Sequence, residues 1–216
     1  MPEGLRAFLD EVASTESVPA GGSIAAATVA MAAALLVKAA KLSREHWTEA
    51  EAEAAVTGAE AARLHAASLV DADADAYRAL QAAWREARDL VEPARTKVIE
   101  VPLAIVRTAA EVTKLAETLA ARGNPRLRGD ADVAAILAAA AAQGAAELVA
   151  INLSSTPDDQ RLTGAQRGLQ ARDGFQRAAE RDQLSGIRVT LCCPGSKAFE
   201  VANRLQRSAE RFAQVG

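Results

Sequence analysis

Apolar positions recur along most of the chain at the spacing of helices, and only one run is strand-like. Segment 5–13, LRAFLDEVA, predicts a short amphipathic helix. Segment 23–44 is almost wholly apolar and predicts a long buried helix. Its apolar run, 24–37, is 14 residues long. A membrane span needs roughly 20 residues, so this length suits a core helix better.

Capping and stop signals divide the middle of the chain into further helices. A third helix is predicted to begin near Thr48, a suitable N-cap before EAEAEAA. It is expected to reach Leu90, with DADAD at 71–75 as a candidate break. Pro93 suits the first turn of a fourth helix, within which Pro102 predicts a kink.

A second apolar helix follows the fourth. Gly123 and Asn124 predict the end of the fourth helix. From Asp130 or Ala131 onward, ADVAAILAAAAAQGAAELVAINL predicts a helix that is apolar on almost every side. Two such helices predict an all-α fold, a bundle of long helices in which both lie at the centre and are surrounded.

The remainder of the chain is more polar. Residues 165–184 predict a polar helix, 186–195 a short extended or irregular piece, and 196–214 a closing amphipathic helix. No internal repeat or linker divides the 216 residues, which are consistent with a single domain.

Composition and charge exclude several classes of function. The formal net charge of −3 gives no basic surface for nucleic acid or an anionic membrane. The N-terminus has an early acid and no long apolar run, so a signal peptide is not expected. Cys192 and Cys193 are adjacent, which predicts no disulfide framework and a cytoplasmic setting. With two histidines and no spaced Cys/His set, no metal site is expected.

The glycine turn before the first apolar helix is one candidate site. A helix N-terminus offers free N–H groups and a partial positive charge. Gly21 and Gly22 leave room for an anion or a polar ring to approach them. Taken alone, the stretch is explained better by a tight turn with Ser23 as the cap.

Three alternating acids, Asp71, Asp73 and Asp75, lie within LVDADADAY. On a helix they fan over about 200°, so one can point inward while its neighbours face water. An inward carboxylate would have a perturbed proton affinity and could act as a general acid or base. A solvated acidic face is the simpler interpretation of this segment alone.

The loop RGNPRLRGDAD leads into the second apolar helix. Asp130 is a suitable N-cap for that helix, and the arginines of the loop could bind a carboxylate or phosphate. A capped, solvated loop is an equal alternative. Lys38 and Lys41, about one turn apart, either extend to the surface or line a pocket that receives an anion.

Five of these segments, in the same order, resemble the cyclodeaminase/cyclohydrolase family. This is the folate-dependent domain of formiminotransferase-cyclodeaminase and of free-standing methenyltetrahydrofolate cyclohydrolases. The segments are FLDEVASTESVPAGGSIAAATVAMAAAL, LVDADADAY, the VPL at 101–103, GNPRLRGDADVAA and LVAINL. The similarity covers about residues 5–156 and leaves 157–216 as a divergent tail of the one domain.

The resemblance implies a dimeric all-α protein with a tetrahydrofolate derivative as substrate. In the cyclohydrolase reaction, water opens the methenyl bridge to give 10-formyltetrahydrofolate. In the cyclodeaminase reaction, N10 attacks the formimino carbon and ammonia leaves. Both reactions need a group that moves protons at a tetrahedral carbon between two nitrogens. No formiminotransferase domain is evident in the chain, which favours the cyclohydrolase reaction.

The family motifs also imply site residues. Asp73 is expected to be the general acid/base, with Asp71 as the second choice. Gly21, Gly22 and Ser23 are expected to let the flat folate ring approach the helix start.

Asn124 and Asp130 are expected to line the same pocket. Lys41 is a further expected binding residue, at a position where the family usually has asparagine. Other polar or glycine positions of the family are occupied here by Ala20, Gly129 and Leu148. These departures leave two alternatives open, namely a non-catalytic folate-binding module and a structural dimeric bundle on the same scaffold.

Overall fold

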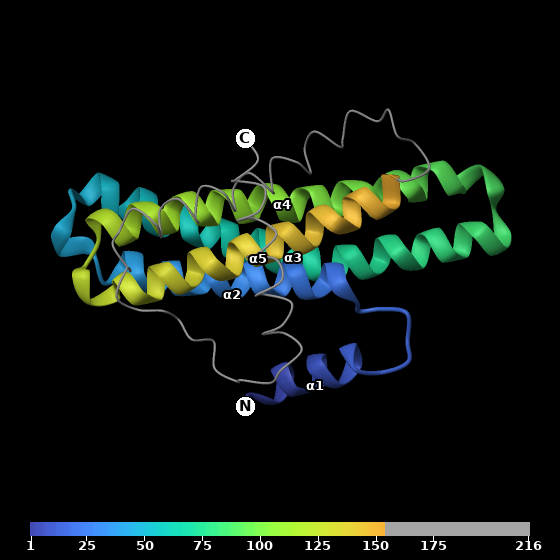
Figure 1. Cartoon of the computed structure of the whole chain (residues 1–216), viewed down its shortest axis with the longest axis horizontal. Coiled ribbons are helices and arrows are strands. Elements are labelled where there is room, and N and C mark those ends of the chain that lie inside the picture. Colours follow the sequence, from blue (N-terminus) through green and yellow to red (C-terminus); the bar gives the residue numbers. More distant parts are fainter. Residues whose placement is uncertain (154–216) are drawn as a thin grey trace, which may run out of the picture. The chain divides into compact units, whose positions relative to one another are not determined.

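The computed structural model describes residues 1–153, which contain no strand. The α-helices are α1 (Glu3–Val12), α2 (Gly21–Lys41), α3 (Glu49–Glu86), α4 (Val91–Arg122) and α5 (Arg128–Leu153) (Figure 1). Short 3-10 helices occupy the connections at Arg44–His46, Arg88–Leu90 and Pro125–Leu127. The predicted all-α class is confirmed. The predictions for residues 157–216 lie outside the described residues.

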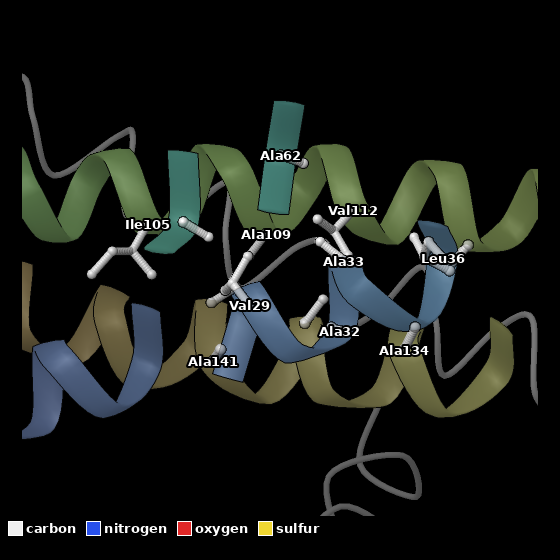
Figure 2. Packing of buried hydrophobic residues seen from close by; sticks show 14 of the residues in the cluster. Val29, Ala32, Ala33, Leu36, Ala62, Ile105, Ala109, Val112, Ala134 and Ala141 are labelled. Carbon is white, nitrogen blue, oxygen red and sulfur yellow. The ribbon is translucent and has the colours of Figure 1, made fainter. Parts of the chain in front are cut away.

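Helices α2 to α5 form a four-helix bundle. α2 packs against both α3 and α5, and α4 also packs against both of them. Figure 1 shows the four helices running alongside one another. The core is built largely from alanine with a few larger aliphatic residues (Figure 2), including Val29, Ala32, Ala33, Leu36, Ala62, Ile105, Ala109, Val112, Ala134 and Ala141. Because alanine has a small side chain, the helix axes can approach closely.

The expectation that both apolar helices are surrounded is wrong for the described part of the chain. Met31 of α2 is 50% exposed, and Val133 and Ile136 of α5 are 47% and 49% exposed. By length and composition alone, Gly21–Lys41 and Pro125–Asn152 could each cross a membrane. About half of each is buried inside the bundle. One side of each helix therefore belongs to the core, while the other presents apolar residues outward.

The sequence predicted the start of α3 and the end of α4 correctly. Thr48 forms a capping box with Glu51, in which each side chain accepts a hydrogen bond from the backbone N–H of the other. Arg122 of α4 donates to Glu51 at 2.6 Å. The Arg122 and Thr48 hydrogen bonds lower the pKa of Glu51 to about 2. This cluster joins the start of α3 to the end of α4, where Gly123 is the C-cap as predicted.

Four predictions about helix boundaries are wrong. α3 ends at Glu86 and does not reach Leu90, because a separate 3-10 helix occupies Arg88–Leu90. α3 continues through 71–75 without a break, because a helix can direct the flanking acids of DADAD to solvent. α2 ends at Lys41, not near Arg44. Asp130 is the third residue of α5 and not its N-cap. Asn124 instead caps the preceding 3-10 helix, where its Oδ1 accepts from the Arg126 N–H at 3.0 Å.

A proline inside α4 creates a gap in its hydrogen bonding that α5 fills. α4 runs through Pro102, which has no N–H to donate to the carbonyl of Val98. The side-chain amide of Asn152 donates to that carbonyl at 2.8 Å. Asn152 therefore supplies the hydrogen-bond donor that Pro102 lacks. This hydrogen bond also attaches the C-terminal turn of α5 to α4.

We expect Asn152→Ala to lower the free energy of unfolding by about 1–2 kcal/mol, because the Val98 carbonyl loses its donor. In a Pro102→Ala background, the restored backbone N–H can serve that carbonyl, so the same change should cost less than about half as much. Urea denaturation of the four proteins in this cycle measures the difference. Equal costs in both backgrounds would show that Asn152 does not replace the missing N–H.

Candidate functional site

The site is built around the first turn of α2. The N-cap position is Ala20, which has no side chain that can accept a hydrogen bond from the helix. The backbone N–H of Ile24 bonds to the Ala20 carbonyl, so the N–H groups of Gly21, Gly22 and Ser23 precede the first intrahelical bond. This turn therefore presents donors and the positive end of the helix dipole to whatever lies above it.

The carboxylate of Asp73, from the middle of α3, lies against this turn. A Cβ added at Gly22 would overlap the Asp73 carboxyl carbon and Oδ1, and would lie 2.6 Å from Oδ2. Gly22 is buried, whereas Gly21 is exposed. The close approach that Gly22 permits is thus occupied by an acid of the same chain.

Ser23 connects the two helices at this contact. Its hydroxyl lies 3.1 Å from Asp73 Oδ2 and 3.0 Å from the carbonyl oxygen of Val70. Ser23 is fully buried, so its side chain faces α3 and not a solvent-accessible pocket. Its expected contact with substrate stays a prediction, and its contact with Asp73 is what the structure shows.

The environment of Asp73 favours the protonated acid more than water does. Burial raises the pKa of Asp73, while hydrogen bonds from the Ser23 side chain and backbone act in the opposite direction. Asp71 and Asp75 are exposed, and Asp75 pairs with Arg78 at 2.9 Å. The expectation that one acid of the segment points inward is confirmed, and that acid is Asp73.

One wall beside the turn is apolar. The Leu148 side chain of α5 lies 4.0 Å from where a Cβ on Gly21 would be. Leu148 is half-buried. A ligand that reaches Gly21 would therefore contact an aliphatic side chain of α5. The half-buried Asp73 of α3 lies beside the next residue, Gly22.

The other predicted binding residues lie at the opposite end of α2. Lys41 is the last residue of that helix, and 21 residues at 1.5 Å each span about 30 Å. Asp130 pairs with Lys38 at 3.0 Å. The N–H of Asn124 donates to Ser43 Oγ at 2.8 Å, and its side-chain amide donates to the Leu42 carbonyl at 3.2 Å.

A single chain therefore does not bring Asn124, Asp130 and Lys41 to Asp73. The family resemblance implies that these residues share one pocket with Asp73, but the length of α2 separates them from it in space. Their role in binding stays a prediction. Among the residues that the structure describes, no group of three or more His, Cys, Asp or Glu side chains could hold a metal ion.

The sequence did not predict three side-chain contacts of the structure. The Ser23 hydroxyl meets residues 47 and 50 positions away, and Asn152 meets Val98 54 positions away. Nothing in the local pattern around Ser23 identifies Val70 as its partner. For Asn152, the one available signal is the interior proline, which implies a carbonyl in need of a donor.

Comparisons with known proteins agree on one family. The formiminotransferase-cyclodeaminase family model matches residues 4–170. Formimidoyltransferase-cyclodeaminase of Sus scrofa is 35% identical over 170 residues, which cover 72% of this chain and 31% of that protein. Methenyltetrahydrofolate cyclohydrolase of Methylorubrum extorquens is 31% identical over 170 residues, which cover 72% of this chain and 82% of that protein.

A solved structure agrees as well. The crystal structure of formiminotetrahydrofolate cyclodeaminase from Thermotoga maritima matches with a TM-score of 0.75 and 28% identity. The match covers 82% of this chain and 93% of that one. The chain thus spans less than a third of the length of the Sus scrofa protein, and most of the length of the other two.

We expect Gly22→Ala to lower the free energy of unfolding by about 1–3 kcal/mol, because the new methyl group overlaps the Asp73 carboxylate. Gly21→Ala is the matched control one residue earlier, and should change stability by less than about 1 kcal/mol. Thermal or urea denaturation compares them. If Gly22→Ala costs the same in an Asp73→Ala background, the carboxylate is not the group that the methyl displaces.

Proposed function

The chain belongs to the formiminotransferase-cyclodeaminase family, and from that premise we propose that it is a folate-dependent one-carbon enzyme. It is a methenyltetrahydrofolate cyclohydrolase or a formiminotetrahydrofolate cyclodeaminase, and Asp73 is its general acid/base. The observation that carries the proposal is a half-buried carboxylate placed on a glycine-lined helix N-terminus. A tetrahydrofolate derivative is the substrate.

The chemistry requires a proton to be taken up and given back. In the cyclohydrolase reaction, water adds to the cationic methenyl carbon and loses a proton to a base. The resulting tetrahedral carbon then releases one ring nitrogen, which must receive a proton as the carbon–nitrogen bond breaks, while the hydroxyl group becomes the formyl carbonyl and releases its proton to solvent. One carboxyl group can serve both steps, because its burial brings the pKa of Asp73 closer to neutral pH. In its charged form it also favours the cationic substrate.

The cyclodeaminase reaction needs the same two proton transfers in the same order, first from the nucleophile and then to the leaving nitrogen. N10 adds to the carbon of the protonated formimino group and loses its own proton to the carboxylate, and the amino group left on that carbon receives this proton and leaves as ammonia. This chain matches 82% of a protein named as a cyclohydrolase and 93% of one named as a cyclodeaminase. The similarity therefore does not distinguish the two reactions, and an assay with each substrate in turn does.

We further propose that the enzyme is a homodimer through the outward faces of α2 and α5. Met31, Val133 and Ile136 expose apolar surface there, and α2 has no charged residue before Lys38. Met31 is the middle residue of Gly21–Lys41. A two-fold axis passing near it would therefore pair the start of α2 with the end of the partner's α2.

Such a pairing would resolve the separation seen in one chain. The Lys41 end of one protomer, with Asn124 and Asp130, would approach the Asp73 end of the other. Each dimer would then hold two complete sites, each built from both protomers. The predicted binding residues would line one pocket, as the family pattern implies.

A non-catalytic folate-binding module is the second candidate. The observation that favours it is Leu148, which places an aliphatic group beside Gly21 where the family has asparagine. A loss of polar groups around a retained scaffold is what a binding-only relative would show. The two candidates differ in whether bound folate is turned over.

We expect the purified protein to open 5,10-methenyltetrahydrofolate, seen as loss of its near-ultraviolet absorbance, and Asp73→Asn to lower kcat by about 10²–10⁴-fold. Asp75→Asn is the matched control, since that acid is exposed on the same helix, and should keep wild-type activity. Asp71→Asn tests the second choice. Binding without turnover of methenyl or formimino substrates would favour the binding module instead.

Loss of activity in Asp73→Asn should not come from unfolding. A buried acid with a raised pKa binds protons more tightly in the folded state, so its contribution to stability falls as pH rises above the ordinary pKa of aspartate. Asparagine removes that cost. The unfolding midpoint of the variant should therefore match or exceed the wild type at neutral pH, and this advantage should shrink as pH falls.

We expect Met31→Glu to weaken the dimer by at least about 100-fold in Kd, or ~2.7 kcal/mol, because the two-fold axis brings two new charges into an apolar contact. Turnover should be lost with the dimer. Leu64→Glu is the control, since Leu64 is 56% exposed but lies on α3. Analytical ultracentrifugation measures both variants. A Met31→Glu protein that remains dimeric would place the interface elsewhere.

A further inference from the structure

The Ser23 hydroxyl faces two acceptors with only one hydrogen. Asp73 Oδ2 lies 3.1 Å from Ser23 Oγ, and the Val70 carbonyl oxygen lies 3.0 Å from it. A hydroxyl can donate once and accept as well. It can therefore bond to Oδ2 as donor while Asp73 is charged, or to Val70 as donor while it accepts from a protonated Oδ2.

We propose that Ser23 is a positioning residue whose hydroxyl turns between Asp73 Oδ2 and the Val70 carbonyl as Asp73 loses and gains a proton. This inference rests on the proposed function only where it gives the Ser23 hydroxyl a part in the folate reaction. The turn of one hydroxyl leaves the heavy atoms where they are. Asp73 is thus hydrogen-bonded in both of its protonation states.

The surroundings of the two carboxyl oxygens indicate where the proton is held. Oδ1 lies nearest to Gly22, at the helix start, where the neighbouring polar groups are N–H donors. A proton on Oδ1 would face donors and find no acceptor. Oδ2 has the Ser23 oxygen beside it, so the neutral acid carries its proton on Oδ2.

Val70 makes the exchange possible without leaving a buried group unpaired. Its carbonyl lies inside α3, where it already accepts from the backbone N–H one turn later. It can therefore gain or lose the Ser23 hydrogen bond and remain satisfied, because a carbonyl has two lone pairs. Ser23 is fully buried, so water does not compete for its hydroxyl.

No charged side chain takes over this role. Burial raises the pKa of Asp73, and the hydrogen bonds from the Ser23 side chain and backbone lower it. On α3, Asp71 and Asp75 are exposed, and α2 has no charged residue before Lys38. Lys97 and Glu100 on α4 and Glu147 on α5 are also exposed.

In the proposed reaction, the proton lost by the nucleophile would rest on Oδ2 until it returns to the leaving nitrogen. Ser23 would donate to the charged carboxylate before the first transfer and after the second, and would accept from the acid between them. It would hold the carboxyl group in one orientation throughout. Because Ser23 is fully buried, this role acts through the Asp73 carboxyl group and does not depend on a contact with the substrate.

The test measures the Asp73 carboxyl directly in Ser23→Ala, Ser23→Cys and Ser23→Thr. Carbon-13 NMR follows the Asp73 carboxyl signal against pH, with the Asp73→Asn spectrum identifying it. Ser23→Ala should raise the pKa of Asp73, because the charged form loses its stronger, charge-assisted bond. Threonine keeps the hydroxyl and should restore the wild-type value, and cysteine, a weak donor of similar size, should fall between. If alanine prevents folding, the cysteine variant carries the comparison.

Kinetics give a second readout. Ser23→Ala should lower kcat about tenfold or more and move the Asp73 limb of the pH profile upward with the NMR value. An unchanged Asp73 titration in Ser23→Ala and Ser23→Cys would overturn the proposal. A shifted titration in a protein without folate turnover would keep this inference and reject the enzyme. Turnover that requires Asp73, together with an unshifted Asp73 titration, would support the enzyme and overturn the proposed role of Ser23.

Discussion

The contact between the Asp73 carboxylate and the first turn of α2 is the constraint on which this end of the bundle depends. α2 begins at an alanine that cannot cap it, and an acid from the middle of α3 lies there instead. The helix dipole and the Ser23 hydrogen bond offset part of the cost of burying that acid. Gly22 is required because any side chain would occupy the same space. The groups that hold α2 to α3 are thus the groups available for chemistry.

The alanine-rich core has a second consequence. Small side chains let α2, α4 and α5 pack closely, but a four-helix arrangement covers only the inward side of each helix. An outward apolar face is left on α2 and on α5, in the helices that the sequence shows as apolar on every side. Exposed apolar faces mark sites of interaction with protein, membrane or ligand, and the homodimer proposed above would cover both faces by symmetry.

Features that depend on local physics could be predicted from the sequence. The Thr48 cap, the stop at Gly123 and the inward direction of one acid among three all follow from neighbours within a turn or two. Features that depend on distant partners could not. The break expected at 71–75 is absent because helical geometry directs the acid at each end of that stretch outward. Only the packed structure shows that Ser23 meets Val70, and that the expected pocket is divided between the two ends of α2.

The departures from the family pattern bear on binding more than on proton transfer. Ala20 removes a glycine from a turn whose cap is supplied by Asp73, so the cap survives. Gly129 lies near the start of α5 with open space around it, far along α2 from the acid. Leu148 is the departure that lies beside Gly21, where it presents an aliphatic side chain. Asp73 and Ser23 remain joined at 3.1 Å. In the proposed enzyme, these departures would leave the Asp73–Ser23 pair intact and alter the surface offered to a ligand beside Gly21, so they would affect substrate preference more than proton transfer.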